Sequence, residues 1–145
     1  MDWKTEALEK LKRYGSLRSS LTSIPMEIAR LDSQACSIRS SSADKTPVRG
    51  GGNGREEAML NNHVHRQELS WALEQAKYWV EATDLAMGTL NPEERLILFR
   101  MYISPQRGAV GKLSEELGAE QSSIYRRRDA ALQKFTRAFY GAMES

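Results

Sequence analysis

Gly118 separates two amphipathic stretches and constrains the fold of this chain more than any other residue. Before it, Leu113 and Leu117 recur at helical spacing, and the small Ser114 lies beside them. A glycine four residues after that small position can adopt a positive φ without steric cost, so the backbone can reverse sharply between two helices. The sequence therefore predicts a helix-turn-helix within residues 108–135.

The second helix of this motif should begin near Glu120 or Gln121 and carry a polar face. With Ile124 as the inward residue and about 100° of rotation per residue, Ser122 and Arg126 point outward. A basic run is usually a solvated face. However, hydroxyl, amide and basic side chains that follow such a turn match what base-edge and phosphate contacts require. The predicted core of the motif is Leu113, Ser114, Leu117, Gly118, Ile124 and Leu132.

The three successive arginines of this helix should differ in role. Arg126 faces outward, Arg127 lies nearer the packed side, and Arg128 lies nearer still to the core. For Arg128, a structural ion pair with Glu115 or Glu116 is as good an expectation as a DNA contact.

Charge is distributed unevenly along the chain. The 145 residues have a formal net charge of only +2, so a nucleic-acid footprint must be local. Residues 119–145 carry five Lys/Arg against three Asp/Glu, whereas residues 59–88 carry two against four. We therefore expect the C-terminal segment to contact DNA and the long middle segment to avoid it.

The N-terminal residues 1–38 are predicted to form the first helices of a helical arm. One amphipathic helix covers residues 3–14, with Gly15 as a break, and a second runs from residue 23 or 24 to residue 38, with Pro25 in its first turn. A single kinked helix is the alternative. The apolar residues follow the alternating three- and four-residue spacing of a coiled coil, and they are Tyr14, Leu17, Leu21, Ile24, Ile28, Leu31, Ala35 and Ile38.

A serine- and glycine-rich segment, residues 39–58, is predicted to be a flexible connection to the long helix of the arm, residues 59–88. That helix has a matching apolar stripe, and folding it antiparallel onto residues 17–38 would bury both stripes. A second apolar row remains, which consists of Trp71, Tyr78 and Leu85. Either the N-terminal helix or a second subunit must cover this row, and we favour a homodimer through the arm.

A new domain is predicted over residues 89–145. Asn91 is placed as a helix N-cap, Pro92 as the first helical residue and Glu94 as the acid of a capping box. The following helix should end at Ser104 and Pro105. Its core residues are expected to be Leu96, Phe99, Met101, Tyr102 and Ile103, and the last helix should pack through Leu132, Phe135, Phe139 and Met143.

Several classes of site are not expected. Cys36 is the single cysteine, lies beside an apolar stripe and should be buried. The N-terminus has no apolar run of the kind that a signal peptide or membrane span needs. We therefore expect a cytoplasmic location. His63 and His65 fall on different helix faces, which disfavours a metal site. The sequence shows neither paired carboxylates nor a nucleophile with a base at spacings that would place them in one pocket. We therefore do not expect an enzyme, and no cofactor is expected.

Two segments resemble region 4 of bacterial sigma-70 factors, the domain that recognises the promoter −35 element. They are LNPEERLILFRMY, residues 90–102, and KLSEELGAEQSSIYRRRDAALQKF, residues 112–135. The preceding helices resemble the sigma region 4-like regulators of phages and prophages, the RinA and ArpU type of late-gene activators. The resemblance implies that residues at the start of the second helix touch bases. The sequence departs from the family pattern at Glu120, where a capping Ser or Thr is usual, and at Arg127, where an apolar residue is usual.

Together these features predict an all-α protein in which a helical hairpin or coiled-coil arm precedes a sigma region 4-like helix-turn-helix domain. The expected function is sequence-specific binding of double-stranded DNA in transcription regulation, in the cytoplasm of a bacterial host, with RNA polymerase as a candidate partner. A small terminase-like DNA-packaging subunit and a protein-binding helical adaptor without DNA affinity are the alternatives. The predicted DNA-binding residues are Gln121, Ser122, Ser123, Tyr125, Arg126, Arg127, Lys134 and Arg137.

Overall fold

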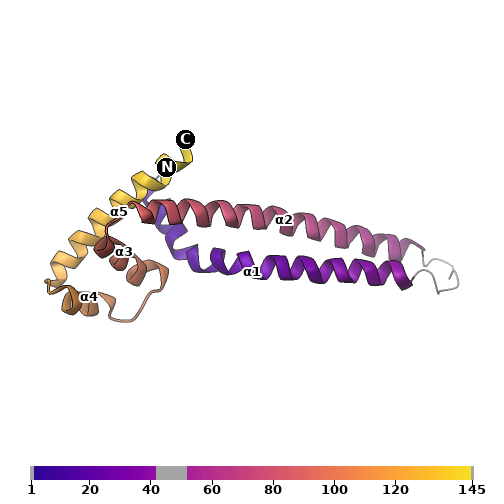
Figure 1. Ribbon diagram of the computed structural model, residues 1–145, viewed down its shortest axis with the longest axis horizontal. Coiled ribbons are helices and arrows are strands. Elements are labelled where there is room, and N and C mark those ends of the chain that lie inside the picture. The colour runs from indigo at the N-terminus through magenta and orange to yellow at the C-terminus, as the bar shows by residue number, and fades with distance from the viewer. Residues whose placement is uncertain (1, 42–51, 145) are drawn as a thin grey trace. The chain divides into compact units, whose positions relative to one another are not determined.

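A computed structural model describes residues 2–41 and 52–144, and it contains no strand within them (Figure 1). The all-α class is therefore confirmed for the described part of the chain. Its elements are the helices α1 (Trp3–Ser41), α2 (Gly52–Gly88), α3 (Pro92–Leu98), α4 (Ala109–Leu117) and α5 (Gln121–Glu144), and the π-helix η1 (Phe99–Ile103). The chain forms two compact units: the first consists of Met1–Arg18 and Tyr78–Ser145, the second of Ser19–Lys77.

Helix α1 runs without interruption through Gly15 and Pro25, so the predicted break is wrong and the single-helix alternative holds. An internal glycine costs a helix about 1 kcal/mol and an internal proline about 3 kcal/mol. Packing on both sides offsets these costs, because Leu11 is buried before Gly15 and Leu31 is buried after Pro25.

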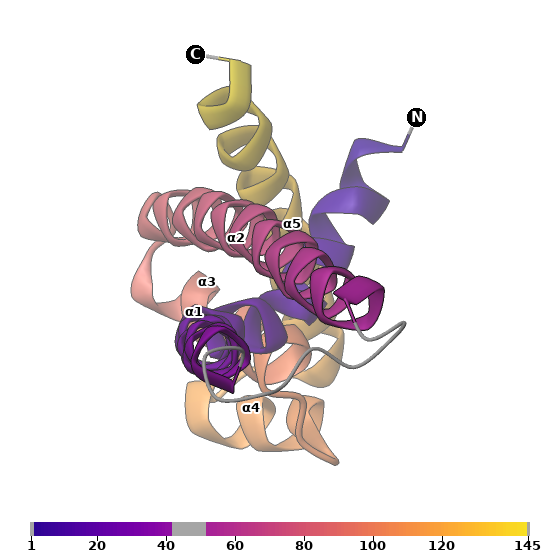
Figure 2. The same cartoon turned by 90° about the vertical axis from the view of Figure 1, so that its right-hand side faces the viewer.

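In the second unit, the two helices pack side by side and run in opposite directions (Figures 1 and 2). Asn62 is buried, and its Nδ2 donates a hydrogen bond of 2.8 Å to the backbone oxygen of Leu31. Arg66 Nη1 donates to Asp32 Oδ1, also at 2.8 Å. A buried, hydrogen-bonded asparagine favours one helix register over others. The apolar periodicity did not predict this contact, because Asn62 is polar.

The predicted connection over residues 39–58 is shorter in the structure. Residues 39–41 belong to α1 and residues 52–58 belong to α2, so the helical ends are longer than the composition indicated. The remainder of that prediction, residues 42–51, lies outside the described residues.

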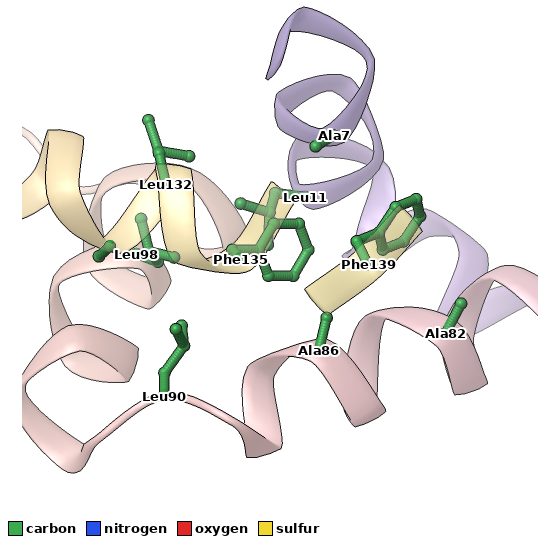
Figure 3. Close-up of a cluster of buried hydrophobic side chains, with 10 residues drawn as sticks. Ala7, Leu11, Ala82, Ala86, Leu90, Leu98, Leu132, Phe135 and Phe139 are labelled. Carbon is green, nitrogen blue, oxygen red and sulfur yellow. The ribbon is translucent and has the colours of Figure 1, made fainter. Parts of the chain in front are cut away.

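The core of the first unit draws on four helices (Figure 3). Phe135 and Phe139 of α5 are its largest side chains, and Leu11 of α1 is fully buried with them. Trp79 of α2 stacks on Phe139 with a ring-centroid distance of 5.8 Å. The other buried members are Ala7, Ala82, Ala86, Leu90, Leu98, Ala131 and Leu132. The predicted domain boundary at residue 89 therefore lies inside one compact unit.

The start of α3 confirms the predicted capping box. The Asn91 side chain accepts a hydrogen bond of 2.8 Å from the Glu94 backbone N–H, and Glu94 Oε1 accepts one of 2.9 Å from the Asn91 backbone N–H. Pro92 occupies the first helical position, where its missing N–H has no cost.

The core residues predicted for the next turns are partly wrong. Ile97 and Leu98 are fully buried, whereas Phe99 is 48% exposed. The reason is that this segment lies between two hydrophobic clusters: Leu98 packs into the core of the first unit and Ile97 packs into a smaller cluster beside α4. The face of the helix that packs against the two clusters therefore carries Ile97 and Leu98, and Phe99 points away from it. The π-helix η1 then ends at Ile103 with Ser104 as its C-cap, which agrees with the predicted end at Ser104 and Pro105.

The capping box predicts a specific response to acid. The Asn91 backbone N–H lowers the pKa of Glu94 below its usual 4.5, and the ion pair with Lys134 acts in the same direction. A carboxylate with a lowered folded-state pKa stabilises the fold above its unfolded pKa, and this contribution is lost as the pH falls through the folded pKa. Glu94→Gln keeps a side-chain acceptor but not the charge. The free energy of unfolding of this variant should therefore decrease less than that of the wild type as the pH falls below about 4.5.

Urea unfolding at several pH values measures this effect. Glu94→Ala should lower the free energy of unfolding by about 0.5 to 2 kcal/mol at neutral pH, because it removes the capping acceptor. Glu115→Gln is a matched control on the exposed surface of α4. Equal acid dependence in wild type, Glu94→Gln and Glu115→Gln would contradict the role of Glu94.

Candidate nucleic-acid interface

The turn between α4 and α5 lies where the sequence predicts it, at Gly118. Gly118 adopts the left-handed conformation with φ 60° and ψ 38°, which confirms the positive φ expected for it, and α5 begins at Gln121. Ser114 does more than provide a small side chain. Its carbonyl accepts the Ala119 N–H at 3.1 Å, and its hydroxyl donates to the Ala119 carbonyl. Ser114 therefore closes the turn from both its backbone and its side chain.

A small hydrophobic cluster fixes the angle between the two helices. Leu113 of α4, Ile124 of α5 and Ile97 of α3 are fully buried together. Leu117 is half-buried at the edge of this cluster. Leu132 is also buried, but it packs into the core of the first unit and not into this cluster, because it lies two helical turns beyond Ile124. This corrects its assignment to the helix-turn-helix core.

The first turns of α5 present polar side chains to solvent. Gln121, Ser122 and Arg126 are exposed, Ser123 is half-buried, and 43% of the Tyr125 surface is accessible. Neither Arg126 nor the exposed Arg137 has an ion-pair partner within the part of the chain that the structure describes. These two cations are therefore available to an anionic ligand.

Two predicted DNA-binding residues are engaged with the acidic start of α3. Arg127 Nη1 pairs with Glu93, and Lys134 Nζ lies 3.2 Å from Glu94 Oε1. The Arg127 side chain remains 41% exposed and that of Lys134 remains 52% exposed. The Arg127–Glu93 pair is exposed on both sides and contributes about 0 to 1 kcal/mol, so a phosphate group can compete for Arg127. The Glu94 side chain is only 18% exposed, so Lys134 has the less exposed partner.

The third arginine has different surroundings from those predicted. Arg128 pairs with neither Glu115 nor Glu116: its Nη2 donates to Asp129 Oδ1 at 2.9 Å. Glu116 instead pairs with Arg100 of η1, at 2.7 Å. The sequence could not reveal this competition, because η1 reaches α4 only through the tertiary fold.

Outside this interface, two sequence expectations meet a clear outcome. Cys36 is exposed, so its predicted burial is wrong; the neighbouring Ala35 takes the buried position on that face. Trp71, Tyr78 and Leu85 are each exposed, whereas the face of α2 that carries Ala82 and Ala86 packs in the core of the first unit together with Ala7 and Leu11 of α1.

The described residues contain no group of three or more His, Cys, Asp or Glu side chains that could hold a metal ion. Of the helices described, none has a segment that is both long enough and apolar enough to span a membrane.

Comparison with known proteins gave no match: no protein-family model, curated protein or solved structure is significantly similar to the chain. The geometry of the helix-turn-helix and the residues quoted above therefore carry the functional argument.

Proposed function

We propose that this protein is a sequence-specific double-stranded DNA-binding regulator of transcription that uses α5 as its recognition helix. The observation that carries the proposal is the exposed polar face at the start of α5, held at a fixed angle to α4 by the Gly118 turn and the Leu113 and Ile124 contact. A helix presented in this way can enter the major groove with its N-terminal side chains toward the bases.

The electrostatics support a division of roles along α5. Gln121, Ser122 and Arg126 lie at its start, where side chains reach base edges in this docking geometry. Lys134 and Arg137 lie two to three turns after Arg126 and are exposed, which suits contacts with phosphates. The resemblance to sigma region 4 extends the proposal to RNA polymerase as a protein partner.

A fluorescence-anisotropy titration tests the proposal. The wild-type protein should bind a random-sequence duplex at low salt, and the logarithm of its affinity should fall linearly with the logarithm of the salt concentration. Arg137→Ala should reduce that slope by about 0.9, the value for one phosphate contact. Lys77→Ala removes the same charge from an exposed position in the second unit and should leave the slope unchanged.

A wild-type protein that binds no duplex at low salt would exclude DNA binding and favour a protein-binding adaptor. A ring of many subunits on DNA would instead favour the packaging subunit, because a regulator that recognises a two-fold operator needs only a dimer.

We further propose that the second unit forms a homodimer. Leu60, Val64 and Trp71 of α2 are exposed, and Trp71, at 68%, is among the most accessible large apolar side chains described. Val64 and Trp71 lie seven residues apart, which is the repeat by which one helix packs along another. A second copy is the favoured occupant, because dimeric helix-turn-helix proteins place two recognition helices on successive half-sites.

Sedimentation equilibrium provides the test for the homodimer. Trp71→Glu should convert the dimer to a monomer, because it places a charge in an apolar contact. Ser70→Glu adds the same charge about 100° away around the helix and should leave the dimer intact. A wild-type protein that is monomeric at high concentration would refute the dimer.

A further inference from the structure

Arg128 is the least accessible of the three successive arginines of α5. Its side chain is 26% exposed, against 41% for Arg127. Both Nε and Nη2 donate to Asp129 Oδ1, at 3.1 and 2.9 Å. The guanidinium is therefore held in place within α5 and is not directed freely toward solvent.

The same guanidinium lies over an aromatic ring of the recognition face. Its Cζ atom is 5.0 Å from the centroid of the Tyr125 ring, within the range of a cation–π contact. Tyr125 stands between the buried Ile124 and the exposed Arg126, and 43% of it is accessible. Arg128 thus restrains the ring while a large part of that ring stays exposed.

Tyr102 of η1 provides a second neighbour for Arg128. Tyr102 is half-buried and packs against the core of the first unit. Burial raises the pKa of Tyr102, and the adjacent Arg128 guanidinium acts in the opposite direction. The arginine therefore has one tyrosine neighbour that packs against the core and another on the recognition face.

Building on the proposed DNA-binding function, we propose that Arg128 is a positioning residue that holds the Tyr125 ring against thymine 5-methyl groups in the major groove. The methyl group is the apolar feature by which thymine differs from the other bases in that groove, and apolar side chains contact it. A ring restrained before binding loses less conformational freedom on contact than a free one. In this arrangement Arg128 does not contact phosphate.

The probe is a fluorescein-labelled duplex recovered from a random library by selection with the wild-type protein. A second duplex has the same sequence with every thymine replaced by deoxyuracil, which removes the methyl groups and keeps the base pairing. The wild type should prefer the thymine duplex by about fivefold or more, the lower end for one good base contact. Tyr125→Ala and Arg128→Met should both lose this preference, whereas Tyr125→Phe, which keeps the ring, should retain it.

Two further readouts separate positioning from a direct contact. Arg128→Met should leave the slope of log affinity against log salt unchanged, whereas Arg137→Ala lowers it by about 0.9. In addition, Arg128→Met should have no further effect in a Tyr125→Ala background, because residues that act through one contact are not additive. Tyr102→Phe removes the hydroxyl beside Arg128 and should weaken the thymine preference; it serves as the second test if Arg128→Met does not fold.

A folded Arg128→Met protein that keeps the thymine preference and has a salt slope lower by about 0.9 would overturn the inference and make Arg128 a phosphate contact. Equal wild-type affinity for the two duplexes would overturn the thymine contact while leaving the proposed function intact. Failure of the wild type to bind either duplex would refute the proposed function and this inference with it.

Discussion

Replacing Leu11 by alanine is expected to lower the free energy of unfolding of the first unit by about 2 to 5 kcal/mol, the cost of a large-to-small change at a fully buried site. Leu11 belongs to α1, yet it is buried in one cluster with Phe135 and Phe139 of α5 (Figure 3). The alanine leaves a cavity beside those two rings. Urea unfolding followed by circular dichroism measures the loss, and duplex binding should fall in parallel as the unit unfolds.

Met26→Ala is the matched control for this prediction. It removes as many heavy atoms from a side chain that is 69% exposed in the second unit and outside the proposed dimer surface, so its effect should stay within about 0.5 kcal/mol. If Leu11→Ala has an equally small effect, or if a fragment of residues 89–145 is as stable as the full chain, then residues 89–145 are an independent domain, as the sequence alone indicated.

Features determined by neighbours in the sequence could be predicted with precision. The Asn91 and Glu94 capping box spans four residues, and the Gly118 turn depends on the conformational freedom of one residue. The apolar side of α5, with Phe135 and Phe139, follows from helical periodicity. In each case the physical cause lies within one or two turns of the chain, and the sequence contains it completely.

Features determined by tertiary packing could not be predicted in this way. Gly15 and Pro25 have the local signature of a break, but burial on both sides keeps α1 continuous. Helical periodicity assigned Phe99 to the core, whereas the meeting of two clusters places Ile97 and Leu98 there. A periodic pattern identifies an apolar face but not the partner that buries it.

The same limit applies to the candidate interface. The outward direction of Arg126 follows from the helix period, and its exposure agrees with that expectation. The partner of Arg127 is Glu93, which lies on another helix, and Arg128 has a tyrosine neighbour from η1. The residue spacing within α5 cannot predict contacts with α3 or η1. The helix period therefore predicts that the three adjacent arginines differ in role, but the partners of Arg127 and Arg128 follow only from the fold.

The recognition helix should separate binding from stability under mutation. Arg126 is exposed at the start of α5 without an ion-pair partner among the described residues. Arg126→Ala should therefore leave the free energy of unfolding nearly unchanged but cost about 1 to 3 kcal/mol of binding to a selected duplex, the range for one base contact. It should also relax the preference at one position of the site.

Ile124→Ala should show the opposite pattern. Ile124 is fully buried with Leu113 and Ile97, so the alanine should cost about 2 to 5 kcal/mol of unfolding free energy. Binding should weaken only in proportion to the unfolded fraction, with base preference retained by the folded molecules. Both variants are measured for unfolding and for binding at one salt concentration, because affinity for DNA varies steeply with salt. If folded Arg126→Ala retains both wild-type affinity and base preference, then this face of α5 does not read DNA, and a role in protein binding becomes the better explanation of its exposed side chains.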